Sequence, residues 1–224
     1  MLINFASDFH FHLPYFTYLA NTAPRFDLTV YGGDFLDVRS GKPTAARQIN
    51  WCRDWLDAFP GEIYCAEGNH DAEDRIDLPK AEAGWLHRLR LPHVKTMGMH
   101  KMGGHQFELM PWDEEPMAEL EKDGSIWISH CPPRGSKCAI TPHGIDFGSL
   151  GIGQSVDLGL GAWLCLSGHL HSCRSWHDHR GATNILNPQV THSDGVVPNH
   201  IVIDTVKRHA TWHSGRTVER IALR

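Results

Sequence analysis

The 224-residue sequence lacks long apolar runs, paired cysteine motifs and an excess of positive charge. Its apolar runs fall well short of the roughly 20 residues that a membrane-spanning helix needs. Its six cysteines form no Cys-x-x-Cys pair, so neither a zinc ribbon nor a thioredoxin-type site is expected. The formal net charge of −5 disfavours nonspecific binding to nucleic acid or to an anionic membrane. We therefore expect neither a membrane nor a nucleic acid as a partner.

The sequence also has no basic segment at its N-terminus and no linker that would divide it. The first eight residues read as a core strand rather than a signal peptide, which predicts a cytoplasmic protein. A content of 41% hydrophobic and 21% charged residues is typical of a globular protein, and the length suits one domain. We expect residues 1–224 to form that single domain.

Histidine is abundant, with 17 residues, five of which lie in short segments that each follow an apolar, β-prone run. The segments are Asp8-Phe9-His10, Gly33-Asp34, Gly68-Asn69-His70-Asp71, Ser129-His130 and Gly168-His169-Leu170-His171. Ligands of open α/β sheets collect beyond the carboxyl ends of the strands. Mixed carboxylate and imidazole side chains suit Mn, Fe, Zn or Ni ions. The five segments in this order predict a pair of divalent metal ions, which is a tool for cleaving phosphate esters.

The remaining pattern predicts an α/β fold. Buried strands are expected at 2–7, 28–31, 62–66, 125–128 and 162–166. Helices are expected at 44–59, which Pro60-Gly61 ends, and more weakly at 15–23 and 116–122. Further strands are expected at 183–186, 200–205 and 209–212, with a hairpin turn at 206–208. Alternating β and α elements followed by antiparallel strands suggest two mixed β-sheets with helices outside.

The ordered segments resemble the calcineurin-like metallophosphoesterases. That family has the pattern Asp-x-His, Gly-Asp-x-x-Asp, Gly-Asn-His-(Asp/Glu), His and Gly-His-x-His, and each element is present in order across residues 8–171. The resemblance implies a four-layer αββα sandwich with a dinuclear metal site. By position, it implies that one metal is bound by Asp8, His10, Asp34 and His171, and the other by Asp34 as a bridge with Asn69, His130 and His169.

The resemblance also implies a catalytic role for His70 that does not involve metal binding. A histidine at this position in the family faces the phosphate and the leaving group, and Asp37 is its expected orienting partner. A hydroxide that bridges two cations is a nucleophile at neutral pH. We expect it to attack in line, while His70 donates a proton or a hydrogen bond to the departing oxygen.

Departures from the protein-phosphatase branch favour small phosphodiesters as substrates. That branch has an arginine after Gly-Asp-x-x-Asp and another before Gly-Asn-His, and both grip a dianionic monoester. Here Val38 and Glu67 occupy these positions, and Arg39 comes one place late. An acidic Glu67 would oppose a doubly charged phosphate. The segment His130-Cys131-Pro132-Pro133 is similar to the small phosphodiesterase-like branch, some of whose members hydrolyse cyclic nucleotides.

Candidate substrate contacts lie near the ligand motifs. His12 continues the same-side spacing from His10, and the alternative is a loop histidine without a catalytic role. Arg134, Lys137 and Arg174 stand close in sequence to metal ligands and are candidates for contacting the phosphate, the alternative for each being a solvated loop charge. A Gly-, Ser- and Pro-rich stretch at 135–161 is expected to be a loop that shapes the substrate pocket.

Other functions remain as alternatives. A phosphomonoesterase or a nuclease of the same superfamily would use the same metals, although a nuclease would require a basic track. A non-catalytic scaffold would have lost metal ligands or the catalytic histidine, and this chain retains both. The sequence leaves open the natural substrate, the metal and whether the chain forms a homodimer.

Overall fold

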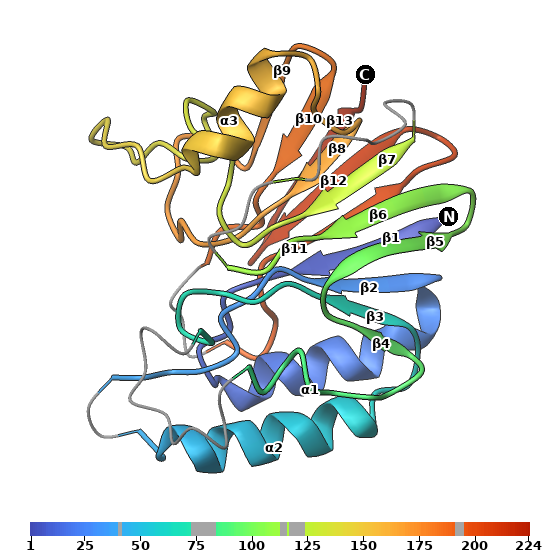
Figure 1. Ribbon diagram of the computed structural model, residues 1–224, viewed down its shortest axis with the longest axis vertical. Coiled ribbons are helices and arrows are strands. Elements are labelled where there is room, and N and C mark those ends of the chain that lie inside the picture. The colour runs from blue at the N-terminus through green and yellow to red at the C-terminus, as the bar shows by residue number, and fades with distance from the viewer. Residues whose placement is uncertain (40–41, 73–83, 113–115, 117–123, 191–194) are drawn as a thin grey trace.

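The computed structural model describes residues 1–39, 42–72, 84–112, 116, 124–190 and 195–224. Two mixed sheets stack face to face, with helices against their outer faces (Figure 1). The strand order is β13-β12-β11-β1-β2-β3-β4 in the seven-stranded sheet and β5-β6-β7-β8-β10-β9 in the six-stranded sheet.

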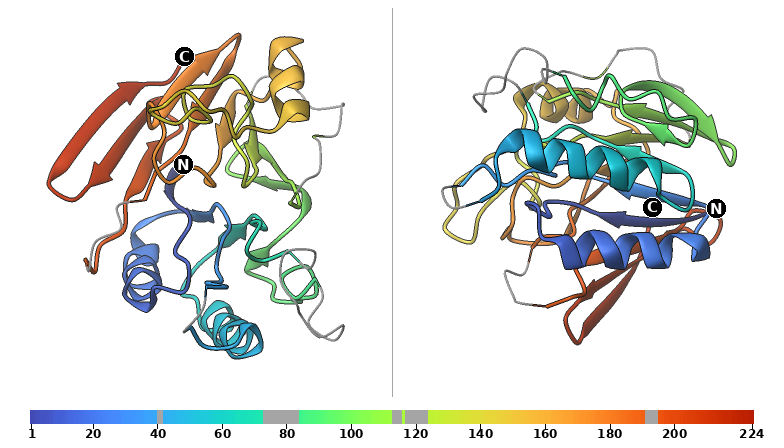
Figure 2. Two further views of the ribbon diagram at one scale, coloured as in Figure 1. Left: turned by 90° about the vertical axis from the view of Figure 1, so that its left-hand side faces the viewer. Right: turned by 90° about the horizontal axis from the view of Figure 1, so that it is seen from below.

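The seven-stranded sheet contains β1 (Leu2–Ala6), β2 (Leu28–Tyr31), β3 (Ile63–Cys65), β4 (Val94–Lys95), β11 (His200–Asp204), β12 (His209–Ser214) and β13 (Thr217–Ala222). Strands β1 to β4 run parallel to one another, whereas β11, β12 and β13 extend the sheet as an antiparallel meander. The helices of this half are α1 (Leu13–Thr22), the 3₁₀ turn η1 (Ala23–Arg25) and α2 (Ala45–Asp57). Figure 2 shows α1 and α2 side by side beneath β1, β2 and β3.

The six-stranded sheet contains β5 (Gly98–Met102), β6 (His105–Leu109), β7 (Ser125–Ile128), β8 (Leu164–Leu166), β9 (His177–Arg180) and β10 (Thr183–Leu186). Strands β6, β7, β8 and β10 are parallel, and each edge strand pairs antiparallel. The helix α3 (Leu150–Asp157) covers the outer face of this sheet (Figure 1).

Side chains along the central strands point alternately to the two faces of the sheet and so pack into two separate layers of the core. In β2 the side chain of Val30 joins the cluster between the two sheets, and that of Tyr31 joins the cluster under α1 and α2. Ile3 and Phe5 of β1 likewise lie between the sheets. Successive strand residues point to opposite faces, so a strand with helices on one side and a sheet on the other is buried on both faces and mostly apolar, with Asn4 and Thr29 as buried polar exceptions. The four-layer αββα architecture expected from the sequence is confirmed.

Most predicted elements lie within two residues of their observed bounds. The strands expected at 28–31, 125–128 and 183–186 coincide with β2, β7 and β10. The helices expected at 15–23 and 44–59 correspond to α1 and α2. The expected helix 116–122 lies almost entirely outside the described residues. The expected loop 135–161 is wrong in part, because residues 150–157 form α3, whose N-cap Ser149 accepts a hydrogen bond from the N–H of Ile152.

Among the described residues, no helix has the length and hydrophobicity needed to cross a membrane. The cytoplasmic location and the homodimer remain predictions from the sequence. The site described next lies at one rim of the two sheets, where the loops after five parallel strands meet.

Candidate metal centre

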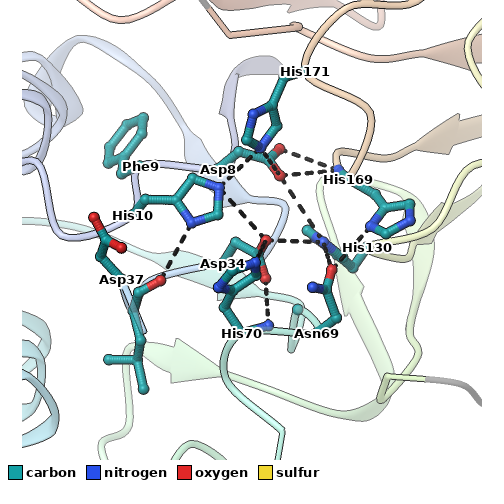
Figure 3. Close-up of polar contacts among 12 residues, drawn as sticks. Asp8, Phe9, His10, Asp34, Asp37, Asn69, His70, His130, His169 and His171 are labelled. Atoms are coloured by element: carbon teal, nitrogen blue, oxygen red, sulfur yellow. Dashed lines mark hydrogen bonds and ion pairs between the residues drawn. The ribbon is translucent and has the colours of Figure 1, made fainter. Parts of the chain in front are cut away.

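The carboxyl ends of five strands from both sheets meet at one rim, and each carries one of the ligand motifs. The loops after β1, β2 and β3 belong to the seven-stranded sheet, and the loops after β7 and β8 belong to the six-stranded sheet. Figure 3 shows the motif side chains converging from these loops. Residues that are distant in sequence thereby form two sets of possible ligands, consisting of Asp8, His10, Asp34 and His171 in the first and Asp34, Asn69, His130 and His169 in the second.

The first set has the dimensions of a metal site. Its four ligand atoms, from Asp8, His10, Asp34 and His171, lie within 4.8 Å of one another. His171 Nε2 is 3.5 Å from Asp8 Oδ1 and 2.9 Å from His10 Nε2. Ligand atoms that each bind one ion at about 2.0–2.2 Å lie roughly 3–4 Å apart, so this set fits a transition ion.

The second set lies on the other side of the Asp34 carboxylate. Asn69 Oδ1 is 2.9 Å from His169 Nδ1 and 3.1 Å from His130 Nε2. His130 Nε2 is 3.5 Å from Asp34 Oδ2, and that same oxygen is 3.7 Å from His10 Nε2 in the first set. Asp34 Oδ2 is therefore placed to be shared, as a carboxylate that bridges two ions would be.

Backbone carbonyls orient two of the imidazole rings. His130 Nδ1 lies 2.7 Å from the carbonyl oxygen of Gly32, and His10 Nδ1 lies 3.3 Å from that of Leu36. When Nδ1 donates its proton to these oxygens, Nε2 is left as the ligand atom that faces the site. Such outer hydrogen bonds fix the tautomer and the ring orientation of metal-binding histidines.

Asp71 joins the loop after β2 to the loop after β3. Its buried carboxylate accepts hydrogen bonds from the N–H groups of Asp34 (2.8 Å), Phe35 (2.9 Å) and Leu36 (3.1 Å). It also accepts one from the N–H of Gly68 at 3.0 Å. Sequence analysis included Asp71 in a motif without giving it a role, and its four N–H donors identify it as the residue that holds Asp34 and Asn69 in register.

Two further buried residues that the sequence analysis missed hold the other loops. The Tyr31 hydroxyl accepts a hydrogen bond from the N–H of Phe9 (2.9 Å) and donates one to the carbonyl of Asp34 (3.0 Å). Asn187 Nδ2, in the segment after β10, donates to the carbonyl of Gly168 at 2.8 Å. The sequence signal for both is weak, because a tyrosine at a strand end and an asparagine after a strand are common features of any sheet.

Several ligand residues have strained backbone conformations. Asp8, His10, Asp34 and His169 have φ angles of 61°, 46°, 61° and 67°, in the left-handed region that L-residues other than glycine rarely adopt. A Cβ atom at Gly68 would collide with the backbone and carboxylate of Asp34, so this glycine is required by close approach. Strain of this kind is concentrated at functional sites, where surrounding contacts enforce it.

The buried carboxylates make the site electrostatically negative. Burial on its own lowers the pKa of His130, but the carboxylates of Asp34 and Asp8 outweigh it and raise this pKa to about 10. Burial on its own raises the pKa of Asp34, but His130 above all holds it below the ordinary range. Burial and the charge of Asp34 raise the pKa of Asp71 to about 8. The site therefore attracts positive charge, which is the setting that divalent cations require.

His70 lies at the edge of the centre and is partly exposed. Its N–H donates to Asp34 Oδ1 at 2.8 Å, and its ring lies 4.7 Å from that of His10. Its Nε2 is 4.0 Å from Asp34 Oδ2, and the side chain is 28% exposed. The ring is thus beside the metal ligands but open to a substrate.

Asp37 does not orient His70 in the described part of the chain. Its carboxylate accepts hydrogen bonds from Arg39 and lies 3.3 Å from Lys42 Nζ. Burial on its own raises the pKa of Asp37, but these cations, Arg39 foremost, lower it to about 2. Among the described residues, Nδ1 of His70 has no hydrogen-bond partner.

The four candidate substrate contacts lie outside the two ligand sets. His12 Nε2 is 3.1 Å from the carbonyl oxygen of Gly195, and the residue is the N-cap of α1. Arg134, Lys137 and Arg174 are exposed on the segments that follow β7 and β8. Their role in binding phosphate remains a prediction.

Glu67, which sequence reasoning expects to oppose a doubly charged phosphate, is in contact with His87 and Trp112. Its Oε1 lies 3.3 Å from His87 Nε2, and its Oε2 accepts the N–H of Trp112 at 3.3 Å. The Trp112 ring in turn lies 5.6 Å from that of His130 and 5.5 Å from that of His169. Glu67 is therefore linked to the second ligand set through Trp112, and its carboxylate also contacts His87.

Comparison with known proteins places the chain as follows. The family model described as calcineurin-like phosphoesterase matches residues 1–217. No curated protein matches the sequence. YfcE, a phosphoesterase from E. coli, is 14% identical with a TM-score of 0.51, and the match covers 100% of both chains. A conserved uncharacterised protein from Streptococcus pneumoniae TIGR4, described as a predicted phosphoesterase, is 15% identical with a TM-score of 0.46 over 98% of this chain and 96% of that one.

Proposed function

This chain belongs to the calcineurin-like phosphoesterase family, and on that premise we propose that it hydrolyses small phosphodiesters with two divalent metal ions. The observation that carries the proposal is the pair of ligand sets that share Asp34 Oδ2. Asp8, His10, Asp34 and His171 would hold one ion, and Asp34, Asn69, His130 and His169 would hold the other. Mn, Fe, Zn and Ni all suit these ligands.

The bound ions would supply a nucleophile derived from water at neutral pH and would neutralise charge on the phosphate oxygens. The protein side chains would orient the reaction. His70, whose Nε2 is 4.0 Å from Asp34 Oδ2, would donate a proton or a hydrogen bond to the departing oxygen. The N–H of His70 fixes Asp34 Oδ1 at 2.8 Å, so that one residue positions the shared carboxylate and serves the leaving group.

The surroundings of the site support a singly charged substrate. Among the described residues, no arginine or lysine forms an ion pair with Asp8 or Asp34. Val38 is exposed where the protein-phosphatase branch has an arginine, and the neighbouring Arg39 is bound to Asp37. A dianionic monoester would require such additional cations more than a diester does. Cyclic nucleotides are one class of diester that this reasoning includes.

The test is a comparison of two substrates with purified, metal-loaded protein. We expect bis-(p-nitrophenyl) phosphate to be hydrolysed with a higher kcat/KM than p-nitrophenyl phosphate, and metal analysis to find up to two transition ions per chain. A strong preference for the monoester would refute the proposed substrate class. Protein that stays inactive with each of Mn, Fe, Zn and Ni would instead indicate the scaffold alternative.

A further inference from the structure

A cavity of about 290 Å³ adjoins the second ligand set. Its walls include the residues Trp112, His130, Cys131, Ser149, Leu150 and Ile152. We call it the Trp112 pocket. Small-molecule sites usually measure about 300–1,000 Å³, so this pocket has room for a group the size of one ring.

The described walls of the Trp112 pocket carry no formal charge other than that of the His130 ring. Leu150 at the start of α3 is 55% exposed, and Ile145 and Phe147 on the preceding segment are also exposed. The lining mixes apolar residues such as Trp112 and Leu150 with the neutral polar residues Ser129 and Ser149, which favours an uncharged ligand, because a buried charge without a partner is costly. The pocket therefore has room and neutral walls for the uncharged organic part of a substrate.

The pocket and His70 lie on different sides of the Asp34 carboxylate. Figure 3 shows His10 and His70 on one side of Asp34, and His130 and His169 on the other. The ring of His70 packs 4.7 Å from that of His10, whereas Trp112 packs 5.6 Å from His130. An ester group that departs beside His70 therefore leaves the pocket free for the group that stays on the phosphate.

We propose that the Trp112 pocket receives the uncharged, ring-sized ester group that stays on phosphorus when a phosphodiester is hydrolysed. This inference rests on the proposed function and deepens it, because a monoester has no second group to fill the pocket. In the reaction the P–O bond to the leaving group breaks and a P–O bond from water forms. One proton of water is transferred to the leaving oxygen and the other to solvent, and the retained ester bond is unchanged.

Glu67 is a positioning residue in this proposal. It accepts the N–H of Trp112 at 3.3 Å and lies 3.3 Å from His87, so it holds the segment that forms one wall. In this proposal its buried carboxylate contributes by keeping the pocket in shape.

The kinetic test varies the retained group and keeps the leaving group constant. The substrates are methyl p-nitrophenyl phosphate and phenyl p-nitrophenyl phosphate. In the wild type we expect kcat/KM for the phenyl ester to exceed that for the methyl ester about tenfold, which is the discrimination that a pocket of fitting size gives. Leu150→Trp should fill the pocket and bring the ratio to about one or below.

Leu158→Trp is the matched control, because Leu158 lies at the other end of α3, is 74% exposed and does not line the pocket. This variant should keep the wild-type ratio. A ratio that is the same in the wild type and in Leu150→Trp would overturn the inference while leaving the proposed function intact. Inactivity towards both esters would count against the proposed function. In that case the binding test below decides whether the pocket receives a ring-sized group.

The binding test uses Cys131, which is partly exposed in the pocket wall while the other five cysteines are buried. Alkylation of metal-loaded protein with N-ethylmaleimide is followed by intact mass, and Cys131→Ser should abolish the fast reaction. We expect diphenyl phosphate to slow the alkylation several-fold and dimethyl phosphate at the same concentration to leave it unchanged. Equal rates with both compounds would refute the inference whatever the catalytic result.

Discussion

At the scale of single residues, three buried side chains that bind neither metal nor substrate set the geometry of the centre. Tyr31 links the loops after β1 and β2. Asp71 links the loops after β2 and β3, and Asn187 fixes the turn after β8. Each satisfies backbone groups that would otherwise be buried without partners, which is the costly alternative. The ligands are therefore held before any ion binds, since the loops constrain one another.

His70→Ala should lower kcat by about a hundredfold or more, in the range expected for loss of a general acid. Metal content should stay near that of the wild type, because the hydrogen bond to Asp34 comes from the N–H of residue 70 and survives the change. The measurement is steady-state kinetics together with metal analysis. His100→Ala, on β5 and outside both ligand sets, is the control histidine. Loss of metal in His70→Ala would show that the ring is a ligand.

Metal affinity should fall as the pH is lowered. His130 can bind an ion through Nε2 only after that atom loses its proton. Because Asp34 and Asp8 raise the pKa of His130 to about 10, the ring is protonated at neutral pH in the metal-free protein. Between about pH 8 and 6 the apparent affinity for the second ion should decrease about tenfold per unit, with release of one proton on binding. Calorimetry in buffers of different ionisation enthalpy would measure the affinity and the number of protons released. An affinity independent of pH would contradict the assignment of His130 as a metal ligand.

At the scale of secondary-structure elements, the sequence predicted the central strands well and the edges poorly. Central strands such as β2 and β7 are buried on both faces, so their apolar runs stand out. The edge strand β13 is almost wholly exposed, and β9 consists of His177–Arg180, with no apolar side chain. Such strands exist because a neighbour supplies hydrogen bonds, which local sequence does not reveal. The helix α3 was missed because it contains two glycines, which have low helix propensity. It is stabilised by packing and by the N-cap Ser149.

Gly68→Ala should disrupt the loop after β3, because a Cβ atom would meet the backbone of Asp34. We expect a loss of stability of about 1–3 kcal/mol, as for other forced overpacking, together with reduced metal content. Gly61→Ala, just before β3, is the matched control, because a Cβ there would meet no atom within 4 Å. Chemical denaturation and metal analysis of both variants check this. Equal metal content in the two variants would show that the close approach is not needed.

At the scale of the whole molecule, the metal centre joins the two sheets at one rim. Asp8, Asp34 and Asn69 follow strands of the seven-stranded sheet, whereas His130, His169 and His171 follow strands of the six-stranded sheet. The motif order predicted this set of residues, because the carboxyl ends of parallel strands meet in such a fold. The motif order could not predict the roles of Glu67 and Trp112, since their contact depends on how the segment after β6 crosses the rim.

Removal of metal should lower the melting temperature. An ion present at about 100 times its Kd stabilises the folded state by about 2.7 kcal/mol. For a chain of this length that corresponds to a shift of roughly 5–10 °C. Differential scanning calorimetry before and after chelation would measure it, with Asp34→Ala as a variant that should melt at the same temperature with and without chelator. An unchanged melting temperature in the wild type after complete loss of metal would show that the ions do not hold the sheets together.

The left-handed backbone at Asp8, His10, Asp34 and His169 has a consequence for how such a chain can change over evolutionary time. Glycine adopts these angles without strain, so replacing a ligand by glycine relieves part of the cost that the ligand imposes. At these four positions, selection for activity therefore favours the ligand side chain, whereas selection for stability favours glycine. A descendant freed from the need to bind metal would lose these four side chains early, and it could keep its fold while doing so.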